Sequence, residues 1–241
     1  MAAGPSRRVD GVPHPPPGSA TQDAPAPVGT IRRRTRRAWL LLAVATAFGT
    51  VLVSPYLLLD IHSSRVALTS EAHYAVLVVH VFAACVALVL GPLQFIPTIR
   101  ARRRVHRVIG RLYLFAGVLP GAVAAVPVAL LSGRLMTQVG LTIPAVLWLV
   151  TGTLAYRAAR RHDYLAHRNW MIRNYALTFL AVTSRILVPL LLLARIPFTD
   201  ASRGSLGHDA TSMIRVGQVL GWIVDLAVAE VLIRRRRQGA S

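Results

Sequence analysis

Several polar and ionisable side chains stand inside the long apolar stretches of this sequence. The ones that bear on chemistry are His80, Gln94, Arg185, Asp225 and Glu230. Burying such groups in the hydrocarbon core of a bilayer is costly, so they pair with one another and often mark an ion or ligand pathway. We expect these five residues to form an intramembrane polar cluster that binds a small ligand or a proton.

Arg185 is the deepest of these groups. At the helical rise it lies about 21 Å from Met171, in a hydrocarbon core about 30 Å thick. We expect its side chain to face the interior of the bundle, with Asp225 and Glu230 as candidate partners. Pro189 leaves a nearby backbone acceptor, because proline cannot donate to the carbonyl four residues earlier.

A polar and small-residue face runs along the second apolar stretch. At seven-residue intervals it carries His73, His80, Ala87 and Gln94. This spacing keeps the four on one side of a helix, where small neighbours permit close helix approach. A packing seam is the alternative interpretation to a functional site. Pro92 predicts a kink near the end of this helix.

Histidines on membrane helices also raise the alternative of a haem or quinone-linked electron carrier. Haem proteins of the b type hold iron between histidines on facing helices. His80 is the one histidine well inside a predicted span, and His106 and His167 form one candidate pair at the same interface. The first expectation is that no cofactor is bound, with haem b at that pair as the alternative.

Soluble-type catalytic motifs are missing from the sequence. It contains no phosphate-binding glycine loop, no metal-ligand spacing and no nucleophile elbow. We therefore predict no catalytic residues and no metal site, and enzymatic activity is not expected.

The elements that must position the cluster are six apolar segments. The chain has 241 residues, 54% of them hydrophobic and only 15% charged. Each segment is long enough to cross a bilayer as a helix, and none alternates like a strand of a membrane barrel. The sequence predicts an all-α integral membrane protein, a six-helix bundle over residues 38–233. The predicted spans are 38–60, 73–98, 111–131, 138–158, 171–194 and 214–233.

The arginines predict the orientation of the bundle. The sequence has no lysine, and 22 of its 28 arginines lie outside the spans or close to a span end on the side of the termini, against 5 on the other side. Arg185 is the one arginine deep within a span. Positive residues concentrate in cytoplasmic loops. We expect both termini to be cytoplasmic. The Arg-only, Ala-rich composition is typical of a bacterial genome, which favours a bacterial plasma membrane.

The segments outside the bundle are predicted to be tails. Residues 1–37 are rich in Pro, Ala, Gly and Arg and are expected to be a disordered basic cytoplasmic tail, and residues 234–241 a second basic tail. The run "RRRTRRAWLL" also resembles a twin-arginine export signal, but an uncleaved first helix is the stronger interpretation. The basic residues flank helix ends instead of forming one face, so we predict no nucleic-acid partner.

Two similar segments open odd-numbered spans. They are "HRVIGRLY" at 106–113 and "HRNWMIRNY" at 167–175. We expect both to be interfacial anchors, with Tyr113 and Tyr175 at the level of the headgroups.

Three blocks carry a family resemblance. They are residues 80–117, 167–189 and 221–233, with "GPLQF", "HR..GR.Y" and "HR.WMIR.YAL" followed by Arg. The chain resembles, over residues 40–233, the prokaryotic domain of unknown function 2306 family of predicted membrane proteins. The resemblance implies a membrane location and no particular activity. Members of that family often carry Asn at the position of Asp225.

The expected partners are the lipid bilayer and anionic headgroups at the cytoplasmic face, with a homo-oligomer or a membrane complex as a further alternative. For function, the ligand or proton site stands beside three alternatives. These are a haem or quinone-linked electron carrier, a proton-coupled transporter, and a structural or assembly subunit whose polar residues only join helices.

Overall fold

A computed structural model describes residues 28–57, 70–195 and 203–238 of the chain. The regular secondary structure in these ranges is entirely helical. Six helical stretches are long and apolar enough to cross a membrane, which confirms the predicted all-helical fold and its six spans. The elements are α1 (Val28–Val53), η1 (Ser54–Tyr56), α2 (Glu71–Leu93), α3 (Pro97–Ala101), α4 (Arg103–Arg111), η3 (Leu112–Val118), α5 (Leu119–Leu130), α6 (Leu135–Arg160), α7 (Tyr164–Arg195) and α8 (Arg203–Gln238).

Helix α1 begins earlier than the sequence suggests. It starts at Val28, inside the segment predicted to be a disordered tail, because arginine is a good helix former and the apolar part extends the helix backwards. Residues 1–27 of that predicted tail lie outside the described residues, as do residues 239–241 of the second tail.

The second span is shorter than predicted. Helix α2 ends at Leu93 and α3 begins at Pro97, so residues 73–98 do not form one kinked helix. Two prolines explain the break. Pro92 contributes no N–H to the last turn, and the ring of Pro97 holds Ile96 in an extended conformation (φ −72°, ψ 123°).

The third span contains a π-helical segment, η3, between α4 and α5. The N–H of Leu119 bonds to the carbonyl of Leu114, five residues earlier, where an α-helix would use four. Pro120 follows at once and has no N–H for the carbonyl of Ala116. π-Turns are rare and frequently occur at functional sites. This one carries the buried Tyr113.

Close helix contacts surround η3. A Cβ added to Gly117 would lie 2.8 Å from the Cβ of Ala87, and one on Gly121 would lie 3.1 Å from the Trp148 ring. Glycine therefore allows α2 and α6 to approach this span more closely than any other residue would. The main core is built here, around Tyr113, Trp148 and Tyr175.

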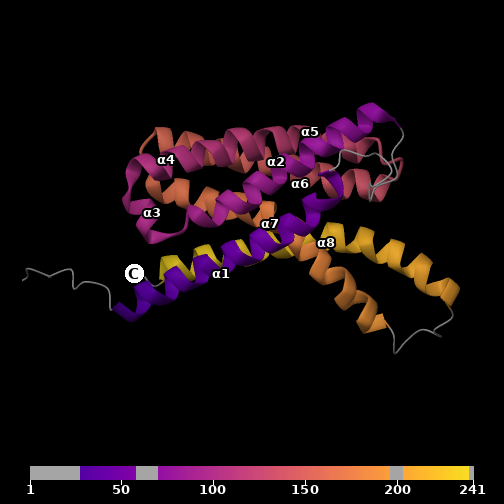
Figure 1. Cartoon of the computed structure of the whole chain (residues 1–241). Helices are drawn as coiled ribbons and strands as arrows, with labels where there is room; N and C mark the ends of the chain where they lie inside the picture. The colour runs from indigo at the N-terminus through magenta and orange to yellow at the C-terminus, as the bar shows by residue number, and fades with distance from the viewer. Residues whose placement is uncertain (1–27, 58–69, 196–202, 239–241) are drawn as a thin grey trace, which may run out of the picture.

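Helices that are consecutive in the sequence pack side by side, with additional contacts between α2 and α5 and between α6 and α8. Figure 1 shows the start of α1, the short helix α3 and the end of α8 at the left end of the bundle. The arginine-rich segments thus gather at one end. The second half of α7 and the first half of α8 leave the other helices and project to the lower right as a pair.

Candidate functional site

His80 joins two helices of the bundle. Its Nδ1 lies 2.7 Å from the carbonyl oxygen of Gly121 in α5, to which it donates in the tautomer that this distance requires. His73, Ala87 and Gln94 lie on the same face of α2 as His80 and are buried, so this face packs against neighbouring helices. The hydrogen bond of His80 therefore joins α2 to α5.

Arg185 does not face the interior of the bundle, and that prediction is wrong. Its side chain is exposed, and its Nη1 donates to the carbonyl of Ala181 at 2.9 Å, one turn earlier in α7. The physical reason is the path of α7. Its second half contacts α8 and runs away from the other described helices (Figure 1).

Glu230 has a different partner from the one predicted. Its carboxylate accepts two hydrogen bonds from Arg173, from Nε at 2.5 Å and from Nη2 at 3.2 Å. The Arg173 guanidinium also lies over the Trp170 ring, 4.6 Å from its centroid. This bidentate pair joins α7 to α8 at the arginine-rich end.

Asp225 lies farther from that end on the same helix pair. Thr183 of α7 donates to its Oδ1 at 2.7 Å. Its Oδ2 is buried and has no hydrogen-bond partner among the described residues, and the same holds for Trp222 Nε1 and Gln218 Oε1. Gln218 and Trp222 were not predicted as site residues. Gln218 lies four residues before Trp222, and Trp222 lies three before Asp225, so all three share one face of α8.

This α8 stripe, Gln218, Trp222 and Asp225, lies where three helices meet. Gly221, next to Trp222, is so close to α7 that a Cβ added there would lie 2.7 Å from the Leu180 side chain. A Cβ added to Gly140 of α6 would lie 2.9 Å from the Val219 side chain of α8. Trp222 packs against the main core. The three side chains are half-buried, and the stripe lies within the candidate span Val216–Gln238.

The predicted five-residue cluster is divided in the structure. None of the hydrogen bonds or ion pairs found among the described residues joins His80, Gln94, Asp225 and Glu230 to one another. His80 lies between α2 and α5, Gln94 at the end of α2, and the two carboxylates at separate levels of the contact between α7 and α8.

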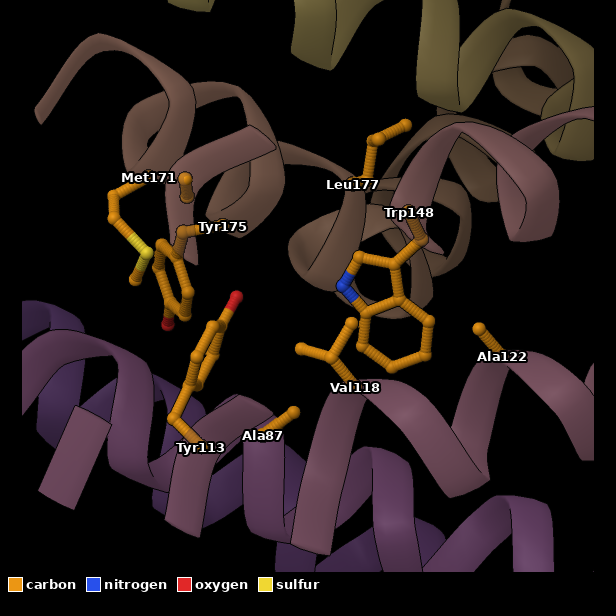
Figure 2. Packing of buried hydrophobic residues seen from close by; sticks show 9 residues of the cluster. Ala87, Tyr113, Val118, Ala122, Trp148, Met171, Tyr175 and Leu177 are labelled. Carbon is orange, nitrogen blue, oxygen red and sulfur yellow. The ribbon is translucent and has the colours of Figure 1, made fainter. Parts of the chain in front are cut away.

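A second polar network was missed altogether. Tyr113 donates to Asn174 Oδ1 at 2.6 Å and lies 2.9 Å from Thr178 Oγ1, to which Trp148 Nε1 also donates at 2.8 Å. Asn174 Nδ2 in turn bonds to the carbonyl of Trp148 at 2.7 Å and to Thr151 Oγ1 at 2.8 Å. In Figure 2 the Tyr113 hydroxyl and the Trp148 nitrogen point into the same space. Each of these contacts joins two different helices.

This network corrects the interfacial interpretation of the two tyrosines. Tyr113 is fully buried and Tyr175 nearly so, and Tyr175 donates to the carbonyl of Leu88 in α2 at 3.2 Å. Figure 2 shows both rings in the core. The missed signal was the pair Asn174 and Thr178, two polar residues one turn apart that had to find partners inside the bundle.

The arginine-rich end gathers the remaining predicted residues. His167 Nδ1 lies 2.9 Å from the carbonyl of Ala155, and His106 interacts electrostatically with His167 and Arg100. Gln94 is buried and lies against Gly110 of α4, which comes one turn after His106. A Cβ added to Gly110 would lie 3.4 Å from Gln94 Oε1. His106 and His167 are thus neighbours, as the sequence analysis considered for a cofactor.

Metal binding through a larger ligand set has no candidate among the described residues, where no three His, Cys, Asp or Glu side chains come together.

Comparisons with known proteins bear on the family and not on the activity. No curated protein and no solved structure matches the chain. The model of one protein family, described as predicted membrane protein (DUF2306), matches residues 77–233. The match includes η3, the α8 stripe and the Tyr113 network, and it covers well over half of the sequence. The chain belongs to the DUF2306 family of predicted membrane proteins.

Proposed function

We propose that this protein lies in the plasma membrane of a bacterium, with both termini in the cytoplasm, and that it binds a small polar ligand or a proton between α7 and α8. The observation that carries the proposal is the α8 stripe. Three of its side chains bury a hydrogen-bonding atom that has no partner among the described residues. Such atoms are scarce in native proteins, and each calls for an explanation.

A buried polar atom without a hydrogen bond costs roughly 1–3 kcal/mol in a protein interior, and the bilayer core offers no water to relieve it. Helix packing alone does not explain three such atoms on one helix face. An occupant that completes their hydrogen bonds recovers this cost.

The three atoms define what the occupant must offer. The indole N–H of Trp222 only donates, an ionised Asp225 only accepts, and the Gln218 amide does both. A small molecule with both donor and acceptor groups fits this set. A proton on Asp225 is the minimal alternative, and Thr183 holds the other carboxylate oxygen in place for either.

The orientation rests on the arginines. Most of them belong to the end of the bundle where α1 begins and α8 ends (Figure 1). Positive-inside bias favours that end for the cytoplasm. The stripe then lies in the membrane with the Arg173–Glu230 pair between it and the cytoplasmic face.

The experiment compares stripe variants with a matched control. Asp225→Ala and Trp222→Phe each remove a buried atom that has no partner among the described residues. Glu230→Gln alters a carboxylate on the same helix whose two oxygens both accept from Arg173. Thermal unfolding of the purified protein is measured across a panel of amino acids, small carboxylates and sugars, and across pH. We expect at least one condition to stabilise the wild type and the Glu230→Gln variant, and neither stripe variant.

Asp225→Asn separates the two occupants. The asparagine side chain has the same shape and can still form hydrogen bonds to a solute, but it does not gain or lose a proton over the pH range of the measurement. If Asp225→Asn loses the pH dependence of its unfolding temperature but is still stabilised by a solute, the site binds a ligand. If it loses the pH dependence and no solute stabilises even the wild type, the site binds a proton. If the stripe variants respond as the wild type does in every condition, the proposal is wrong.

Haem b between His106 and His167 is a second candidate, favoured by one observation. The carbonyl of Ala155 fixes His167 through Nδ1, which is how proteins commonly orient a metal-ligating imidazole and present its Nε2. A Soret band in the purified protein that His167→Ala removes would support it.

Stable co-purification of another membrane protein, lost in the stripe variants, would instead support an assembly subunit.

A further inference from the structure

Gln94 at the end of α2 carries a second unexplained polar atom. The side chain is 6% exposed, and its Nε2 is buried with no partner among the described residues. Its amide packs against α4 beside Gly110, with Oε1 3.4 Å from where a Cβ of residue 110 would lie. A buried amide donor of this kind is costly to leave unpaired.

His106 presents a matching atom on the neighbouring helix. It lies one turn before Gly110, so it stands on the same face of α4. Its Nδ1 is also buried without a partner among the described residues. Arg100 of α3 and His167 of α7 interact with it electrostatically. Gln94 and His106 thus each place a buried atom without a described partner at the same face of α4, and the charge of Arg100 acts on His106.

The charge around this place is one-sided. Helix α4 alone adds Arg103, Arg104, Arg107 and Arg111, all exposed. The carboxylates described near this end already have partners. Asp163 accepts from the N–H of Ala166 at 2.9 Å, and Glu230 accepts from Arg173. Neither is committed to Gln94, His106 or Arg100.

We propose that Gln94, His106 and Arg100 form a binding site for a phosphate group. An amide N–H, an imidazole N–H and a guanidinium are donors that phosphate oxygens accept well. Basic pockets between membrane helices bind anionic lipid headgroups in the same manner. The phosphate comes from such a headgroup or from a soluble phosphate, and the two sources are distinguished below.

The test uses two arginine variants with the same change in net charge. Arg100→Gln removes the guanidinium of the site, and Arg107→Gln removes one from the exposed side of α4. Gln94→Leu removes the buried amide. Each full-length protein is titrated with phosphatidylglycerol in phosphatidylcholine-containing detergent micelles, and separately with inorganic phosphate, and binding is followed by thermal unfolding and native mass spectrometry.

We expect the wild type and Arg107→Gln to bind alike, and Arg100→Gln and Gln94→Leu to bind at least about tenfold more weakly, as the loss of one charge-assisted or buried hydrogen bond implies. Stabilisation by phosphatidylglycerol alone assigns a lipid headgroup, and stabilisation by inorganic phosphate as well assigns a soluble phosphate. Equal losses in the two arginine variants, no phosphate-dependent binding, or a Soret band that His106→Ala removes would overturn the proposal. These residues are remote in sequence from the α8 stripe, and the two proposals fail independently.

Discussion

The hydroxyl of Tyr113 lies 2.6 Å from Asn174 Oδ1, in a contact that joins the π-helical segment η3 to α7. Both side chains are completely buried. Because Thr178, Trp148 and Thr151 bond to the same pair, removal of one member leaves others without partners. The network therefore holds α6, α7 and the third span together through specific hydrogen bonds.

Tyr113→Phe is expected to destabilise the protein by about 1–3 kcal/mol, because it leaves the Asn174 oxygen buried without that donor. Tyr156→Phe is the matched control, since that ring is 37% exposed and stacks on Phe115 through its edge. Thermal unfolding in detergent measures both. Equal unfolding temperatures for the two variants would show that the network contributes nothing to stability.

Gly91→Ala is expected to be more harmful than its size suggests. The new Cβ would lie 2.1 Å from the Tyr175 ring, so the ring must move and its hydrogen bond to Leu88 is lost. Overpacking of this kind costs about 1–3 kcal/mol or more.

Gly110→Ala provides the comparison for Gly91→Ala. Its Cβ would make an ordinary contact of 3.4 Å with Gln94, and Ala favours a helix over Gly by about 1 kcal/mol. We expect Gly110→Ala to unfold at or above the wild-type temperature. A stable Gly91→Ala variant would mean that α2 and α7 are not so closely packed.

The sequence predicts the six helices well and their faces poorly. Length and hydropathy are enough to identify a span, because any helix that crosses a bilayer must be apolar over about 20 residues. The same criterion does not tell which side of a helix meets protein and which meets lipid, since both are apolar. Arg185 illustrates this limit. Its depth follows from counting, but its exposed position follows from how α7 and α8 leave the bundle.

The candidate site also depends on helix faces that the sequence does not reveal. Asp225 was identified because a carboxylate stands out in an apolar run. Gln218 and Trp222 are ordinary residues for a membrane helix, and only the packing of α6 and α7 leaves their polar atoms buried without partners among the described residues. Tyr113 was assigned to the interface because it follows arginines, whereas η3 and its glycine contacts draw it into the core.

The Arg173–Glu230 pair is expected to contribute little to stability despite its bidentate geometry. The two side chains are 22% and 39% exposed, and pairs that solvent reaches are worth at most about 1 kcal/mol. A double-mutant cycle with Arg173→Gln and Glu230→Gln measures the coupling at low and high salt. We expect a small coupling energy that salt reduces. A coupling of several kcal/mol that is independent of salt would indicate that the pair is sealed from water in the membrane.

The proposed orientation predicts opposite labelling at the two ends of α6. Arg134 and Arg161 are both exposed and flank this helix, so Arg134→Cys and Arg161→Cys form a matched pair in which one positive charge is lost. Cys85 is the one native cysteine, and both variants are therefore made with Cys85→Ala. In intact cells a membrane-impermeant maleimide is expected to label Cys at 134, which positive-inside bias places outside. Cys at 161 should react only after the membrane is permeabilised, and the reverse pattern would place the arginine-rich end, with Gln94 and His106, on the outer face.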